Sequence, residues 1–222
     1  MKITKAMKAM RQNPVVSPGG HIDFCDGVNY LDAVAGKAGF MKRSEINAAI
    51  RKASAAFKKN SWALPPNPHW DVTDFGLGDF AKYGLILVNL AEQPEYCEKL
   101  MFAAKRQVTP RHYHQAKKED IICRFGKLAI ELPSRRKTIK LQVNGEWCSI
   151  PTSKPLVLKA GDRVTLTPKV LHAFWPVSEY AIIGEVSTTN DDAHDNFFED
   201  KRVGRFSRIV EDQPALVKLV SD

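Results

Sequence analysis

The sequence predicts a mostly β protein, an antiparallel barrel or sandwich that is preceded by a helical arm. From Trp70 onward, the 222-residue chain is a series of short apolar or alternating runs, each interrupted by Gly, Pro, Asn or Asp. Strands this short at such close spacing are typical of all-β barrels and sandwiches. The length suits one domain, and 44% hydrophobic with 26% charged residues is an ordinary globular composition.

The helical arm is predicted over residues 44–59. Ile46, Ile50 and Phe57, with the alanines between them, place apolar side chains on one face of a helix. The segment LPPNPH that follows ends the helix, because proline cannot continue it. Residues 1–40 show weak periodicity, and we treat them either as an N-terminal extension of uncertain role or as residues upstream of a natural start at Met41.

Seven apolar or alternating runs are predicted as the strands of the β region: 83–90, 99–104, 120–132, 138–143, 156–161, 163–168 and 180–189. Asn144 and Gly145 predict a hairpin turn, since both residues tolerate positive φ. The chain after Asn190 is polar and irregular, and we expect it to pack on the barrel as a tail. Residues 41–222 are therefore predicted as one domain, with the helical arm at about 41–68 and the barrel at about 70–190.

Charge and cysteine content narrow the function classes. The formal charge of +8 raises the question of nucleic acid, but the chain has no zinc-finger spacing, helix-turn-helix pattern or aromatic RNP-like strand, so we predict no such partner. No apolar run approaches the ~18 to 20 residues that span a membrane. The cysteines lie far apart without a CxxC pair, which predicts reduced, structural thiols in a cytoplasmic protein.

The segment TPRHYHQAKKEDIICRFGK carries the strongest functional signal. His112 and His114 are two residues apart, so on a strand they project to the same face. Glu119 follows a short polar turn at the start of the next strand, and His172 follows a later turn-strand-turn unit. Three imidazoles and one carboxylate form a ligand set that suits manganese, iron, cobalt, nickel or zinc. We therefore predict one divalent metal per chain at these four residues.

The same pattern, H-x-H-x4-E-x6-G followed by GDRVTLTPKVLH, resembles the two-part signature of the cupins. That resemblance implies a jelly-roll barrel. The chain departs from the signature at Arg106, where a glycine is usual, and at Val170, where a glycine is frequent. The segment SRRKTIKLQVNGEWCSIP also lengthens the separation between the two motifs, which a jelly roll tolerates as a hairpin at one end.

More of the chain resembles one group of cupins. MKRSEINAAI, WDVTDFGLGDF, RHYHQAKKEDI, GEVSTTNDDAHDNFF and GRF are similar in order and spacing to the D-lyxose ketol-isomerases, from Met41 to near the carboxyl terminus. The resemblance implies a metal-dependent isomerase, usually a manganese enzyme. It would interconvert D-lyxose and D-xylulose, and also D-mannose and D-fructose, through a metal-stabilised enediol.

Three residues are candidates for proton transfer. Lys117 lies between two predicted ligands, and the resemblance implies a catalytic role; the alternative is a lysine that only solvates a turn. Glu119 is both a ligand and a second candidate proton acceptor. Glu185 ends the strand YAIIGEV and is a candidate general base if it points inward among apolar neighbours; the alternative is a surface charge.

Sugar hydroxyls need several hydrogen-bond partners and usually an aromatic face. The candidate hydroxyl partners are Trp70, Asp71, Asp74, Asp195 and Arg205, and Phe174 and Trp175 are the candidates for the aromatic face. For Trp175 and its neighbour Phe174, core packing is the competing interpretation.

Two other functions use the same predicted metal site, namely a cupin dioxygenase or oxidase and a non-catalytic sugar-binding cupin. A phosphosugar substrate is a nearer variant, but the chain has no glycine-rich phosphate cradle. Exposed strand edges on such a barrel predict a homodimer.

Overall fold

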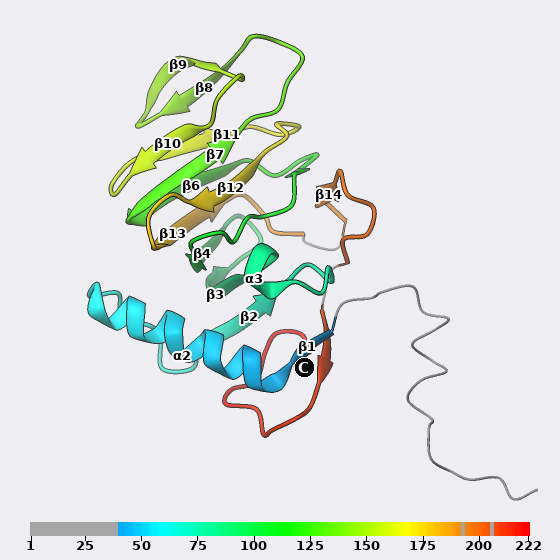
Figure 1. Ribbon diagram of the computed structural model, residues 1–222. Helices are drawn as coiled ribbons and strands as arrows, with labels where there is room; N and C mark the ends of the chain where they lie inside the picture. The colour runs from blue at the N-terminus through cyan, green and yellow to red at the C-terminus, as the bar shows by residue number, and fades with distance from the viewer. Residues whose placement is uncertain (1–39, 192–193, 205–206) are drawn as a thin grey trace, which may run out of the picture. The chain divides into compact units, whose positions relative to one another are not determined.

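Most strands join one antiparallel sheet. The computed structural model describes residues 40–191, 194–204 and 207–222. Eight strands follow the order β2–β3–β4–β13–β6–β11–β8–β9 (Figure 1). They are β2 (His69–Thr73), β3 (Leu85–Glu92), β4 (Cys97–Ala104), β6 (Glu119–Phe125), β8 (Thr138–Val143), β9 (Glu146–Pro151), β11 (Arg163–Leu166) and β13 (Tyr180–Ser187). The seven predicted runs all form strands.

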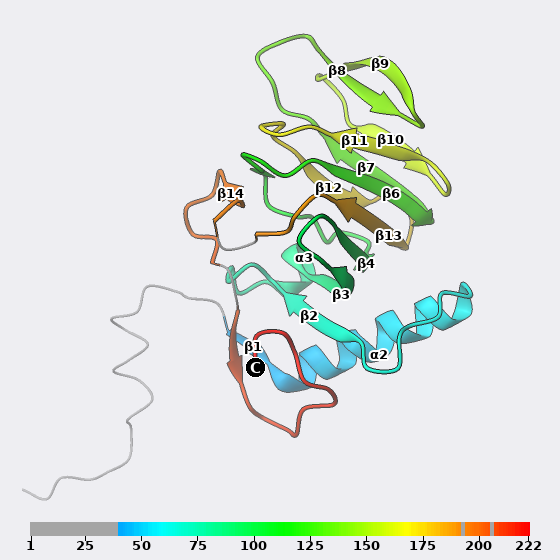
Figure 2. The same cartoon turned by 180° about the vertical axis from the view of Figure 1, so that it is seen from behind.

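A second sheet closes the barrel core. It contains β10 (Leu156–Lys159), β7 (Lys127–Glu131) and β12 (Ala173–Pro176) in the order β10–β7–β12. Leu128, Ile130 and Leu158 from this sheet pack in one buried cluster with Met101 and Ile121 from the large sheet. The β8–β9 hairpin extends the large sheet at the end away from the helix (Figure 2). Asn144 (φ 55°) and Gly145 (φ 85°) form its turn, as predicted.

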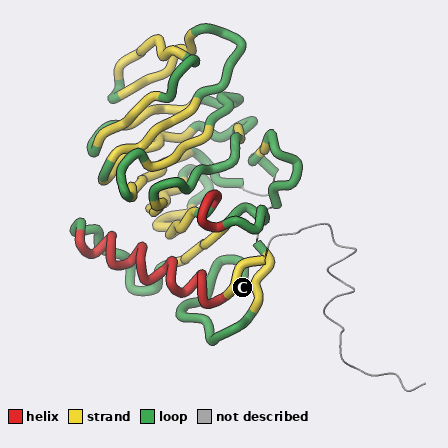
Figure 3. Tube along the Cα trace, viewed as in Figure 1, coloured by secondary structure: helices red, strands yellow, loops and turns green. Residues whose placement is uncertain are grey.

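The helical arm covers the outer face of the large sheet. Helix α2 (Arg43–Lys59) begins one residue before the predicted start and ends at the predicted residue. Helix α2 lies along the β2 side of the sheet (Figure 3). Its buried side chains pack on those of β2, β3 and β4 in a second cluster that includes Ile46, Ile50, Phe57, Trp70 and Phe102. Strands β2 to β4 are therefore covered on both faces. Neither α2 nor the single-turn α3 (Phe80–Tyr83) is long and apolar enough to cross a membrane.

The C-terminal tail packs on the arm and the sheet edge. Strand β15 (Arg208–Val210) pairs in parallel with β1 (Phe40–Lys42). The buried guanidinium of Arg43 lies 2.6 Å from Glu211 and 2.9 Å from Asp222. Leu219 is buried beside Trp70, and the two residues form an isolated β-bridge. The segment predicted as an N-terminal extension lies, apart from Phe40, outside the described residues.

Candidate metal centre and active site

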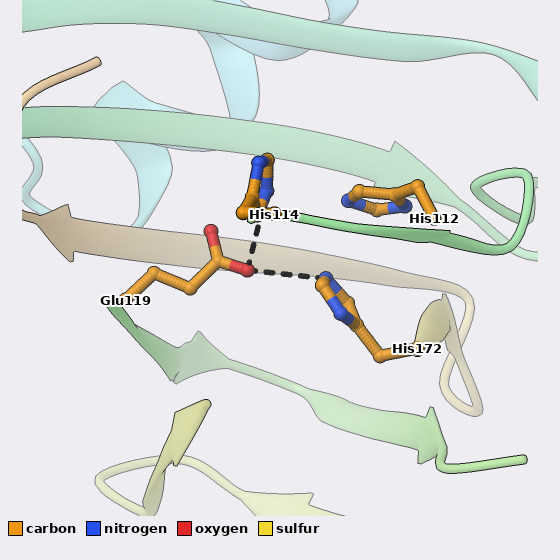
Figure 4. Close-up of side chains that lie close together, drawn as sticks. All are labelled: His112, His114, Glu119 and His172. Atoms are coloured by element: carbon orange, nitrogen blue, oxygen red, sulfur yellow. Dashed lines mark ion pairs between the residues drawn. The ribbon is translucent and has the colours of Figure 1, made fainter. Parts of the chain in front are cut away.

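The four predicted ligands converge inside the barrel mouth. His112 lies on β5 (His112–Tyr113), Glu119 begins β6, and His172 directly precedes β12. The backbones of His112 and His172 exchange two hydrogen bonds of 2.9 Å, which brings the two motifs together. One ligand atom from each of His112, His114, Glu119 and His172 lies within 4.8 Å of all the others (Figure 4).

The backbone orients all three imidazoles in the same way. Each ring places Nδ1 against a carbonyl oxygen: His112 at 2.9 Å from Pro110, His114 at 2.6 Å from Asp195, and His172 at 3.0 Å from Val170. A carbonyl oxygen only accepts, so Nδ1 carries the proton of each neutral ring. The lone pair of Nε2 is then available to a metal, in the arrangement that supports metal-ligating histidines.

The inward-facing atoms fit a cation. Among the described residues, His114 Nε2, His172 Nε2 and Glu119 Oε1 are buried without a hydrogen-bond partner. Glu119 Oε1 lies 3.1 Å from His172 Nε2 and 3.6 Å from His114 Nε2. Proteins leave few buried polar atoms without a partner. A cation bound between these three atoms would be the partner that each of them lacks.

Burial and charge favour the protonation states that bind a metal. Burial lowers the pKa of both His112 and His114, which keeps these imidazoles neutral. Burial alone would raise the pKa of Glu119, but the Lys117 ammonium overcomes it and holds that pKa well below its ordinary value. Neutral imidazoles and an ionised carboxylate are the ligand forms that a divalent cation requires.

A buried network of charges adjoins the four ligands. Lys117 Nζ lies 3.0 Å from Glu119 Oε2 and 2.9 Å from Glu185 Oε1. Burial would lower the pKa of Lys117, but the two carboxylates outweigh it and raise that pKa. Lys99 Nζ lies 3.8 Å from the same Glu185 oxygen. Glu185 points inward, as the alternation of its strand predicts; its carboxylate lies beside two ammonium groups, and Ile121 is its apolar partner on β6.

The ligands and this network line a single pocket of about 390 Å³. That volume suits a small-molecule ligand. Apart from the ligands, Lys117 and Glu185, the polar residues of its lining come from β2, β3, β4, the segment before β5 and the segment after β13: Asp71, Thr73, Asn89, Glu92, Lys99, Thr109, Asn190, Asp191 and Asn196. Phe75, Phe174 and Phe198 are its aromatic members.

Trp70 lies outside this pocket, contrary to its predicted role. Side chains alternate along β2, so Asp71 and Thr73 line the pocket while Trp70 and Val72 face the helix. Trp70 is 2% exposed and stacks on Phe57 with ring centroids 6.3 Å apart. Its position assigns it to the core between helix and sheet instead of to substrate binding.

Asp74 and Trp175 also lie outside the residues that line the pocket. The Asp74 carboxylate accepts backbone hydrogen bonds from Gly76 (2.9 Å) and Gly78 (2.7 Å) and a hydroxyl bond from Ser207, so it holds a turn. On β12, Phe174 lines the pocket. Trp175 is absent from the lining, because successive side chains of a strand point to opposite faces. Of the two residues predicted for the aromatic face, Phe174 therefore lines the pocket and Trp175 does not.

Asp195 contacts the metal-binding segment rather than the pocket. Its carboxylate accepts backbone hydrogen bonds from Gln115 (2.6 Å), Ala116 (3.0 Å) and Lys117 (2.7 Å), while its carbonyl receives His114 Nδ1. Burial would raise the pKa of Asp195, but these backbone bonds lower it. Asp195 thus positions a ligand and the turn that carries Lys117. The remaining substrate candidate, Arg205, lies outside the described residues.

Sequence reasoning missed Lys99 and Asn89. Lys99 occupies an inward position of β4 in alternation with Met101, and both line the pocket. A lysine at a position where alternation predicts an apolar side chain was the available signal. Asn89 carries the same signal on β3, in alternation with Leu85 and Leu87.

Comparison with known sequences gives one family. The family described as "D-lyxose isomerase" matches residues 67–222. A D-lyxose/D-mannose isomerase of Serratia proteamaculans is 33% identical over 215 residues, covering 78% of this chain and 94% of the relative. A D-lyxose ketol-isomerase of Cohnella laeviribosi is 30% identical over 171 residues, covering 72% of this chain and 94% of the relative.

Solved structures match the fold. The L-ribose isomerase of Cellulomonas parahominis superposes with a TM-score of 0.61 at 17% identity, over 78% of this chain and 100% of that one. An L-ribose isomerase of Acinetobacter sp. DL28 superposes with a TM-score of 0.60 at 19% identity, over 78% of this chain and 100% of that one. At this level of identity the match concerns the fold alone, and it confirms the predicted cupin barrel with a helical arm.

Proposed function

Because the chain belongs to the D-lyxose isomerase family, and is therefore an aldose–ketose sugar isomerase, we propose that it interconverts D-lyxose and D-xylulose. D-mannose and D-fructose are the second proposed pair. The proposed cofactor is one manganese ion per chain. We also propose that the protein is a homodimer and that it lies in the cytoplasm.

One arrangement carries this proposal. Three Nε2 atoms with the same orientation and the Glu119 carboxylate meet at one point, and the Lys117–Glu185 pair adjoins it. A divalent cation held by His112, His114, Glu119 and His172 would supply Lewis-acid polarisation of the sugar carbonyl. The nitrogen-rich ligand set with one carboxylate suits manganese, and iron, cobalt, nickel or zinc would also fit it.

The proton transfers are assigned to residues of the chain. Isomerisation removes a proton from C2 of the aldose and returns one to C1, with an enediol between the two steps. We assign both steps to the Glu185 carboxylate, which would take the proton from C2 and return it to C1. Lys99 and Lys117 hold this carboxylate in place. Lys117, with its ammonium between two carboxylates, is assigned the proton exchange at the sugar oxygens. Glu119 is the alternative proton acceptor, although a carboxylate that binds a metal is the weaker base.

The test is an assay of metal-stripped protein to which manganese, cobalt, nickel, iron or zinc is returned. Manganese should restore formation of D-xylulose from D-lyxose and of D-fructose from D-mannose, without oxygen uptake. His172→Ala should abolish both metal binding and turnover, while His69→Ala, at an exposed position on β2, should leave both unchanged. Tight metal binding without ketose under any of these conditions would exclude the proposed reaction. Oxygen uptake would instead point to a dioxygenase.

A further inference from the structure

Three polar side chains form a row across the pocket wall. Asn89 on β3 pairs directly with Lys99 on β4, and Lys99 pairs with Glu185 on β13. Paired residues of adjacent strands project to the same face, and all three line the pocket. Because adjacent strands lie about 4.8 Å apart, the row extends about 10 Å outward from Glu185.

The inner and outer ends of this row differ in their partners. At the inner end, Glu185 accepts a hydrogen bond of 2.9 Å from Lys117. In the middle, Lys99 donates a hydrogen bond of 2.9 Å to Asn190. At the outer end, the side-chain oxygen of Asn89 is buried and has no hydrogen-bond partner among the described residues.

A buried amide oxygen without a partner destabilises a fold, so an apolar residue would serve the structure better at this position. Polar groups of this kind are typical of small-molecule sites, where they fix the orientation of the ligand. A sugar hydroxyl both donates and accepts, so it satisfies either end of the amide. The position and the missing partner together point to a hydroxyl-bearing ligand.

We infer that Asn89 is a specificity-determining residue that binds the terminal hydroxyl of the open-chain sugar. The inference rests on the proposed function, which places C1 and C2 of the sugar beside Lys117 and Glu185. The rest of an extended sugar then follows the row past Lys99 and ends at Asn89. The Glu92 carboxylate also lines the pocket and accepts a hydrogen bond of 3.3 Å from Asn190, the residue to which Lys99 donates. A carboxylate near this end of the row disfavours a phosphate and favours a neutral hydroxyl.

The test compares D-lyxose with 5-deoxy-D-lyxose in the wild-type enzyme and in Asn89→Ala. The wild type should lose about tenfold in kcat/KM on the deoxy sugar, as expected for one hydrogen bond to a buried group. Asn89→Ala should lose about tenfold on D-lyxose, chiefly through a higher KM, and should no longer discriminate between the two sugars. Its melting temperature should stay level or rise. Asn89→Asp, which keeps an acceptor oxygen, should restore part of the discrimination.

Asn47→Ala is the matched control. The buried Asn47 amide is bonded at both ends, donating to the Pro214 carbonyl and accepting from Leu216 N–H, each at 2.9 Å. This variant should lower the melting temperature and leave the discrimination intact. A tenfold penalty for the deoxy sugar that persists in Asn89→Ala would overturn the inference, as would a loss of stability in Asn89→Ala with an unchanged KM.

A failure of the proposed reaction can be separated from a failure of this inference. If the wild type forms no ketose, calorimetric titration with the same two sugars still tests Asn89. Tighter binding of D-lyxose than of the deoxy sugar, lost in Asn89→Ala, supports the inference without turnover. Equal affinities in both proteins, or no binding of D-lyxose to the wild type, contradict it.

Discussion

The ammonium nitrogen of Lys117 lies 2.9 Å from a carboxylate oxygen of Glu185, and both side chains are buried. Removing two charges from water is costly, and their mutual attraction often only balances that cost. The contribution of this pair to the stability of the fold therefore does not explain why two charged residues occupy these buried positions. The position of the pair beside the four predicted metal ligands fits the proposed proton transfer, which needs an acid and a base held in place.

Replacing Lys117 by methionine should lower kcat at least 100-fold, the usual contribution of a positioned acid or base. It should also reduce the free energy of unfolding by about 3–5 kcal/mol, because Glu185 loses its nearest partner. The double variant Lys117→Met/Glu185→Gln should recover stability but not activity. Ketose formation and urea unfolding measure the two effects.

Lys105→Met is the control for burial. Lys105 and Glu179 lie 2.8 Å apart but are exposed, so water screens the pair, and breaking it should leave the free energy of unfolding nearly unchanged and kcat unaffected. Wild-type turnover in Lys117→Met would remove Lys117 from the mechanism.

Asp195→Ala should weaken manganese binding about 10- to 100-fold, as loss of a residue that orients a metal ligand does. The reason is that three backbone N–H groups of the turn between His114 and Glu119 lose their common acceptor. The manganese dissociation constant and kcat should both change. Asp200→Asn, in the same segment but bonded to the exposed Arg202, should change neither. Unaltered manganese affinity in Asp195→Ala would show that the turn holds its shape without this carboxylate.

Trp70→Leu should destabilise the fold by about 2–3 kcal/mol through the lost packing against the helix. The KM for D-lyxose should not change well below the melting temperature, because Trp70 faces away from the pocket. Trp147→Leu is the matched change at a residue that is 58% exposed, and it should leave stability nearly unchanged. A raised KM in Trp70→Leu would restore the tryptophan to the substrate site.

Burial raises the pKa of Cys97 from 9.0 to about 11. The folded pKa exceeds the unfolded one, so the unfolded chain loses its proton first as the pH rises. This contribution to stability is complete below pH 9 and is lost as the pH rises toward 11. Between pH 8 and 11, the free energy of unfolding measured in urea should therefore fall less steeply in Cys97→Ala than in the wild type. Cys148→Ala, at a partly exposed thiol, serves as the control, and equal slopes in all three proteins would contradict the assignment.

Local patterns were sufficient for the framework and for the ligand set. The spacing of apolar residues predicted helix α2 nearly to the residue and the seven runs that form eight of the strands, because these periodicities depend only on neighbours in the chain. His112, His114 and Glu119 lie within eight residues of one another, so their short separation already favoured their meeting, although β5 pairs with β14 and not, as a hairpin would require, with β6. The substrate wall was harder to predict. Strands β2 to β4 are covered by the helix on one face and line the pocket on the other, so alternation alone did not distinguish Trp70 from Asp71.

The sequence by itself predicted the β class, the helical arm and the four candidate metal ligands from residue type and spacing, and the resemblance of its motifs identified the cupin class and the family. The tertiary structure alone decided the rest. Lys99, Lys117 and Glu185 meet because the register of β4 against β13 and the turn before β6 place them together. Asp195 left the predicted substrate set for the same reason, because a loop distant in sequence folds back onto the metal-binding turn. Such pairings depend on how strands align across the sheet, which no local pattern encodes.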